Sequence, residues 1–175
     1  MMMQMLVAGG AVAFTDDLRR PDVSNPRGYY EHEAVKRLQR DASWLPAANG
    51  KAIKVVAPLL AALPPGPRYT VVFMDRALDI VVRSQATMLG EGSAADVPSA
   101  DLTRSLQSFR QSSLDWAERT DRVHLLRLEH SEVLARPKTA ADRVARFVEM
   151  HASLTLDPER MATAVDPSLR RHLPS

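Results

Sequence analysis

The spacing of hydrophobic residues changes within the stretch Tyr69 to Leu89, which reads YTVVFMDRALDIVVRSQATML. Its first six residues, Tyr69 to Met74, are mostly β-branched, aromatic or long apolar types, which suits a strand that is buried on both faces. From there the apolar residues follow helical spacing, at Leu78, Val81, Val82, Met88 and Leu89. A strand that leads directly into a helix is half of a βαβ unit, so the pattern predicts a parallel sheet.

Two further segments have the composition of strands. Ala52 to Ala57 is the first, and Pro58 ends it; Val123 to Leu128 is the second. Together with Tyr69 to Met74 they give three strands, and we expect all three to be parallel because helical segments separate them along the chain. The predicted fold class is therefore α/β: a three-layer domain with a parallel sheet and helices on both faces.

Helices are predicted from apolar spacing and from residues that favour helix ends. The first is Met1 to Ala8, closed by Gly9-Gly10. A capping box of Thr139 and Asp142 predicts the start of another, and Asp166-Pro167 predicts a last short one. The remaining helical segments are Tyr29 to Asp41, the short turn Leu59 to Leu63, and Asp101 to Arg119.

Composition indicates one soluble domain, residues 1–175. A chain of this length with 45% hydrophobic residues can bury one core of ordinary size. The 23 basic and 21 acidic residues nearly balance, which gives no reason to expect binding to nucleic acid or to an anionic membrane. Cysteine is absent, which excludes disulfides, thiolate metal sites and cysteine nucleophiles.

The apolar start of the chain does not have the form of a signal peptide. It lacks a basic leader, and Gly9-Gly10 interrupts it. No apolar run approaches the roughly 20 residues that a membrane-spanning helix needs. We therefore expect a cytoplasmic protein without a membrane span; homo-oligomerisation is left open.

Arg76 and Ser84 are the candidate binding residues at the turn after the central predicted strand. Open α/β sheets bind ligands at the carboxyl ends of their strands. The planar guanidinium of Arg76 and the hydroxyl of Ser84, in the first turns of the next helix, are suited to hold a phosphate. The alternative is that Arg76 pairs with Asp75 or Asp79 and that Ser84 only borders the core.

Several stretches, taken in order, resemble the sulfotransferase family, and especially its bacterial branch. Met1 to Gly10 resembles the helix that follows the family's phosphate loop. Arg76 and Ser84 match the arginine and serine that hold the 3′-phosphate of 3′-phosphoadenylyl sulfate in that family. The other matching stretches are Asn25-Pro26-Arg27-Gly28-Tyr29-Tyr30-Glu31, Leu125 to Leu128 with Glu129, Pro137 and Phe147, and Val165 to Leu169.

The resemblance implies a fold like that of P-loop nucleoside triphosphate hydrolases and a specific reaction. A sulfuryl group would pass from 3′-phosphoadenylyl sulfate, the co-substrate, to a hydroxyl or amine of a small-molecule acceptor, without a metal. In the family a glycine-rich loop before the first helix cradles the 5′-phosphosulfate, and here the chain begins after that position. We therefore expect Met1 to be an internal methionine of a longer protein, with roughly 10 to 20 further residues for a strand and a phosphate loop.

The catalytic residues stay unknown at this stage. The family's frequent base histidine has no counterpart in Ile53 to Pro58. Lys54 is a weak candidate to stabilise charge, and Glu31 or His32 to reach an acceptor. Each has a simpler alternative: Lys54 pairs with a nearby carboxylate, and Glu31 interacts with a helix dipole.

Two other functions compete with an active sulfotransferase. One is a non-catalytic remnant or nucleotide-binding domain of the same fold, which would keep the 3′-phosphate site and lack support for the reacting end of the donor. The other is a relative of nucleotide kinases, which would bind a nucleoside triphosphate with magnesium, whereas the sulfotransferase relative binds adenosine 3′,5′-bisphosphate without metal.

Overall fold

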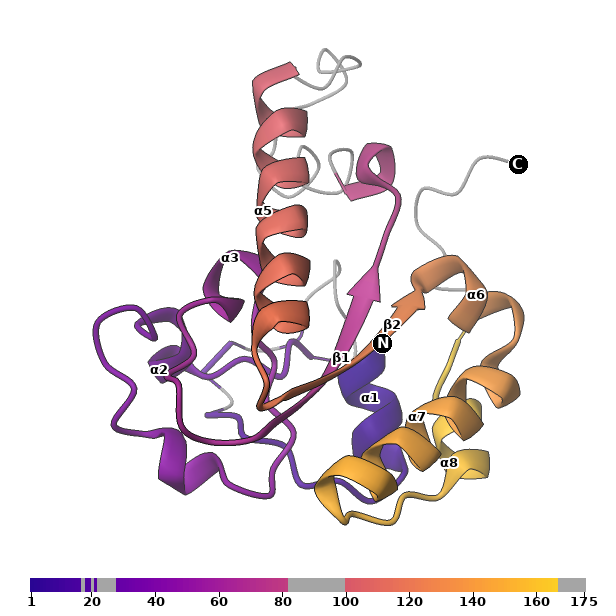
Figure 1. Cartoon of the computed structure of the whole chain (residues 1–175). Coiled ribbons are helices and arrows are strands. Elements are labelled where there is room, and N and C mark those ends of the chain that lie inside the picture. The colour runs from indigo at the N-terminus through magenta and orange to yellow at the C-terminus, as the bar shows by residue number, and fades with distance from the viewer. Residues whose placement is uncertain (17, 20, 22–27, 82–99, 167–175) are drawn as a thin grey trace.

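A computed structural model of the chain describes residues 1–16, 18–19, 21, 28–81 and 100–166 (Figure 1). The elements are α1 (Met2–Ala8), α2 (Glu33–Lys36), η1 (Leu45–Ala48), α3 (Ala57–Leu60), β1 (Tyr69–Asp75), α5 (Ala100–Arg119), β2 (Val123–Glu129), α6 (His130–Ala135), α7 (Pro137–Ala152) and α8 (Pro158–Thr163).

The centre of the fold is a parallel pair of strands. β1 and β2 pair in register from Tyr69 opposite Val123 to Asp75 opposite Glu129. The long helix α5 lies between them in the chain and runs beside β1 (Figure 1). The prediction of parallel strands at Tyr69 to Met74 and Val123 to Leu128 is confirmed, and the structure is a mixed α/β fold whose two-stranded sheet packs against helices.

Alternate residues of the strands belong to two separate hydrophobic clusters, one for each face of the sheet. Tyr69, Val71 and Phe73 of β1 pack with Trp116 of α5 around a core of Leu38, Leu60 and Leu63. Residues of the other parity pack with α1, α7 and α8: Val72, Met74, Leu126 and Leu128, around Met5, Val133, Val144, Val148 and Met161. This two-sided packing explains why apolar residues occupy both alternate sets of positions in β1, since each face of the strand packs against helices.

The predicted strand Ala52 to Ala57 is wrong. Only Ala52 pairs, through a single parallel bridge to Ala13, with its N–H donating to Val12 and its carbonyl accepting from Phe14. Ala57 already belongs to α3, where Pro58 sits in the first turn. A segment with strand-like composition forms a strand only when a neighbouring strand pairs with it. Among the described residues, no backbone segment pairs with Ile53 to Val56.

Two helix predictions also need correction. The helix expected over Tyr29 to Asp41 is limited to α2, because Tyr30 has a left-handed φ of 52° and His32 caps the helix just after it. The capping box of Thr139 and Asp142 does not form. α7 starts earlier, with Pro137 at its first position, where the fixed φ of proline suits a helix start.

α8 is an element that the sequence signals but that was not predicted. The Asp157 side chain accepts a hydrogen bond from the N–H of Arg160 at 3.1 Å, and Pro158 follows at the first helical position. The same Asp-Pro signature was recognised at Asp166-Pro167, where the predicted helix lies outside the described residues. An Asp-Pro pair does mark a helix start in this chain, at Asp157-Pro158, nine residues before the pair that was used for the prediction.

Gly9 and Gly10 end α1 in different ways. Gly10 has a φ of 110°, which L-residues rarely adopt. Gly9 is needed for space, because a Cβ there would lie 2.6 Å from Cγ of Met161 in α8. The predicted closure of this helix by glycine is confirmed, and the first glycine also lets α8 approach the end of α1.

None of the helices within the described ranges combines the length and apolar character that crossing a bilayer requires.

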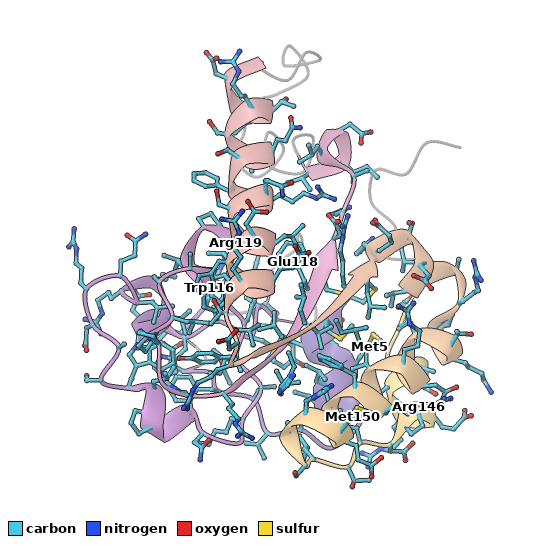
Figure 2. The ribbon with its side chains drawn as sticks, in the orientation of Figure 1. Met5, Trp116, Glu118, Arg119, Arg146 and Met150 are labelled. Atoms are coloured by element: carbon cyan, nitrogen blue, oxygen red, sulfur yellow. The ribbon has the colours of Figure 1, made fainter. Side chains whose placement is uncertain are left out.

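The burial of Met5 gives a test of the α1 side of the core. Met5 is fully buried and Met150 of α7 is 75% exposed; both are labelled in Figure 2. We expect Met5→Ala to lower the free energy of unfolding by about 2 to 5 kcal/mol, because it leaves a cavity, and Met150→Ala to change it by less than about 0.5 kcal/mol. Urea unfolding of both variants measures the difference; equal losses would contradict the packing of α1 against the core.

Candidate functional site

A buried carboxylate, Asp75, occupies the carboxyl end of β1. It is 3% exposed and is bound by two arginines from other elements. Arg110 of α5 makes a two-bond contact, with Nε 2.8 Å from Oδ1 and an Nη 2.6 Å from Oδ2. Arg127 of β2 donates from Nε to Oδ2 at 2.7 Å. The three side chains thus link β1, α5 and β2 at the edge where parallel sheets bind ligands.

These contacts keep Asp75 ionised. The hydrogen bonds from Arg110 lower the pKa of the Asp75 carboxyl; burial opposes this effect, and the bonds from Arg127 lower the pKa further. Arg110 and Arg127 keep part of their surface in contact with solvent, 31% and 45%. Arg127 also lies 3.7 Å from Glu129. The cluster therefore holds two guanidinium groups in place while part of each arginine side chain stays accessible to solvent.

Arg76, the predicted phosphate ligand, is the first residue after β1. Its backbone N–H donates to Oδ1 of Asp75 at 3.0 Å, and its side chain is partly buried. Burial lowers the pKa of the Arg76 guanidinium, which means that its surroundings disfavour the cation. The predicted position of Arg76 in the turn at the carboxyl edge is confirmed. Asp75, one of the two alternative pairing partners, has its carboxylate bound by Arg110 and Arg127.

His130 lies at the same edge, at the first position after β2. Asp75 is opposite Glu129, so Arg76 and His130 are the next residues of the two neighbouring strands. Burial lowers the pKa of His130 to about 4, and the positive charge of Arg76 contributes. This imidazole is therefore neutral at physiological pH. Ser84, the other predicted ligand, lies outside the described residues.

The catalytic candidates Glu31 and Lys54 come together in a separate cluster. Nζ of Lys54 donates to Oε1 of Glu31 at 2.9 Å and to the carbonyl of Tyr29 at 3.1 Å. Arg19 also binds Glu31, at 3.2 Å, and its guanidinium lies 3.4 Å from the centre of the Tyr29 ring. Partial burial favours a higher pKa for Glu31, but the bonds from Lys54 and Arg19 outweigh this and lower the pKa.

The contacts of this cluster support the simpler alternative for Lys54 but not the one for Glu31. The lysine pairs with a carboxylate, as the simpler interpretation predicted. Glu31 is not a helix-start carboxylate, because α2 begins at Glu33 and its N-cap is His32, whose Nδ1 accepts from Ala34 at 3.1 Å. His32 also stacks on Phe14, with ring centres 4.1 Å apart. These contacts give His32 a structural role at the start of α2.

Arg110, Arg127 and His130 were not predicted from the sequence as residues of the site. Arg127 and Asp75 have the same parity along paired strands and so face the same side of the sheet, which the register alone would have revealed. His130 lies two residues after the predicted strand Val123 to Leu128, just as Arg76 lies two residues after Tyr69 to Met74. Arg110 carries no comparable signal, since its contact spans 35 residues and depends on how α5 packs.

In the parts of the chain that the structure describes, no three histidine or carboxylate side chains gather closely enough to hold a metal ion. Comparison of the chain with family models, with curated proteins and with solved structures found no match.

The Asp75 cluster predicts a dependence of stability on charge and pH. We expect Asp75→Asn to lower the free energy of unfolding by about 1.5 to 3 kcal/mol at pH 7, because a neutral amide cannot balance two guanidinium groups. Since the pKa of Asp75 is lowered on folding, this contribution is complete above the ordinary aspartate pKa, about 3.9, and is lost as pH falls through the folded value.

The matched control is Asp101→Asn, because Asp101 pairs with Arg104 while both side chains are largely exposed. Such a pair contributes about 0 to 1 kcal/mol. Urea unfolding at pH 7 and at pH 3 measures all three proteins. Equal losses for the two variants at pH 7, or an Asp75 effect that persists unchanged at pH 3, would contradict the role of the cluster.

Proposed function

We propose that this chain is a sulfotransferase-type α/β domain that binds 3′-phosphoadenylyl sulfate by its 3′-phosphate at the carboxyl edge of β1. Arg76 is the principal ligand and Ser84 its expected partner. The observation that carries the proposal is the place of Arg76: a partly buried guanidinium one residue beyond a parallel strand, at an edge that also holds Arg110 and Arg127.

The electrostatics of Arg76 support an anionic ligand. Its burial disfavours the charged form, as the direction of its pKa shift shows. A phosphate beside it would compensate for this cost, because a planar guanidinium binds two phosphate oxygens at once. Arg110 and Arg127 add positive potential at the same edge, although Asp75 offsets one of their charges.

The arrangement of layers supports the finer fold assignment within this proposal. Helices cover both faces of the β1/β2 pair, with α3 and α5 on one side and α1, α7 and α8 on the other. A parallel pair joined through a helix is the repeating unit of P-loop-like sheets. We propose that the sheet is of this three-layer type.

A second candidate, a nucleotide-binding domain without catalysis, is favoured by one observation. The two catalytic candidates neutralise each other, since Lys54 and Glu31 form an ion pair that Arg19 reinforces. A lysine held in this way is not directed at a leaving group, and an ionised Glu31 with a lowered pKa is a weak base. Binding of the donor nucleotide is common to both candidates, so it is the first property to test.

The binding test uses adenosine 3′,5′-bisphosphate and isothermal titration calorimetry. We expect binding without added metal, and Arg76→Ala to weaken it by about 1.5 to 3 kcal/mol, the range for hydrogen bonds to charged groups. The matched control is Arg119→Ala, an exposed arginine at the other end of α5 from the carboxyl edge. Equal affinities of wild type and Arg76→Ala, or no binding by folded protein, would refute the assignment; binding of a nucleoside triphosphate only with magnesium would indicate the kinase alternative.

Turnover gives a separate expectation for the purified 175-residue chain. Lys54, the candidate to stabilise charge on the leaving group, is held in an ion pair with Glu31 at 2.9 Å. Loss of one preorganised donor typically costs a hundredfold or more in rate. We expect little or no sulfuryl transfer from labelled donor to a panel of hydroxyl and amine acceptors, with Arg76→Ala as the blank; rapid turnover above this blank would show that the leaving group is supported by other residues.

A further inference from the structure

The edge of β2 that faces away from β1 carries backbone groups that are available for pairing. The N–H of Tyr69 donates to the carbonyl of Arg122 at 2.9 Å, and the two strands keep one-to-one register from there to Glu129. In a parallel ladder that begins in this way, the even-numbered residues of β2 bond to β1, whereas Leu125 and Arg127 direct their N–H and C=O groups outward. No described residue forms a hydrogen bond with these outward groups.

β2 lacks features that normally protect an open edge. It is seven residues long, contains no proline and pairs with β1 without a bulge. Its charged side chain, Arg127, binds Asp75 of β1. Val123, Leu125 and Leu126 are apolar but only partly buried. Two strands alone make a marginal sheet, so a further strand at this edge adds both hydrogen bonds and apolar burial.

α7 adds a second surface beside this strand. A groove of about 330 Å³ lies between the two elements and is lined by Leu126, Thr139, Asp142, Arg143 and Arg146. The four helix residues recur at intervals of three and four, so they share one face of α7. Arg143 binds Glu132 at 2.8 Å, whereas Asp142 and Arg146 form no ion pair with any residue in the described ranges. Two opposite charges on this face are therefore available to a partner.

We propose that the outer edge of β2 and this face of α7 bind a second copy of the chain, which gives a two-fold symmetric dimer. The two β2 strands pair antiparallel about an axis beside Leu126. Leu125 of each copy then lies opposite Arg127 of the other, and their outward N–H and C=O groups bond to each other. The sheet continues across the axis as four strands. This interface is independent of the proposed function, because it uses neither Arg76 nor a bound nucleotide.

The order of charges on α7 favours a second copy over another partner. A two-fold axis through the sheet sets the α7 helices of the two copies antiparallel and presents the same residues from both sides. Asp142 and Arg146 are equally far along the helix from Val144, so an axis level with Val144 places each Asp142 opposite Arg146 of the other copy. The face is thus complementary to itself in charge. A uniformly acidic segment would meet Asp142, and a uniformly basic one would meet Arg143 and Arg146.

The test is the mass of the full chain in solution, measured by light scattering over a series of protein concentrations. We expect wild type to reach twice the 19.4 kDa of one chain. Arg146→Asp should raise the dissociation constant about tenfold or more, because like charges then face each other across the axis. Asp142→Arg combined with Arg146→Asp restores the pairs and should restore the dimer. The matched control is Arg119→Asp, on α5; Arg119 and Arg146 are both exposed and are labelled in Figure 2.

Amide hydrogen exchange, followed by NMR, locates the strand pairing. At a concentration where wild type is dimeric and Arg146→Asp is monomeric, the amides of Leu125 and Arg127 should exchange slowly in wild type only. Those of Leu126 and Leu128, which bond to β1, should be protected in both proteins. A wild type that stays monomeric, or a dimer that Arg146→Asp leaves intact, would overturn the proposal. Slow exchange of Leu125 and Arg127 in a monomer would also overturn it, because the edge would then be covered within one chain.

Discussion

The geometry of the carboxyl edge of this sheet depends on the ion pairs that Asp75 forms with Arg110 and Arg127. Asp75 is almost fully buried and accepts bonds from one arginine of α5 and one of β2, so the two strands and their crossover helix meet at one charge. A buried ion pair contributes little net stability compared with apolar packing, but loss of one partner is costly. The cluster therefore fixes the geometry of the edge: α5 cannot slide along β1 without breaking a two-bond contact between charged groups.

Two kinds of environment meet at this edge. Arg110 and Arg127 bind the Asp75 carboxylate. Arg76 and His130, which follow the two strands, both lie where burial works against positive charge. A shift of register by one residue would turn Arg127 to the face of the sheet away from Asp75. The pairing of Asp75 with Glu129 is thus as important for the proposed site as the identity of the residues.

The sequence was most informative where hydrophobic pattern alone determines structure. β1, β2 and α5 were predicted closely, because strands covered on both faces carry apolar residues at both alternate sets of positions and a long amphipathic helix has a clear period. The prediction failed at Ala52 to Ala57, where an apolar segment of strand-like composition forms one bridge only. Composition shows that a segment can enter a sheet, whereas pairing depends on a neighbour that the local sequence does not reveal.

The candidate site was predicted to a similar extent. The position of Arg76 followed from the end of an apolar strand, and the pairing of Lys54 with a carboxylate was foreseen as the simpler alternative. The cluster around Asp75 was not, because Arg110 comes from a helix whose axial position depends on contacts such as the bond from Ser113 to the carbonyl of Ala57 in α3, at 2.7 Å. The contact between Arg110 and Asp75 therefore depends on how α5 packs against α3. The residues that make an edge electrostatically distinctive are therefore the least visible in a sequence, although the elements that carry them can be predicted.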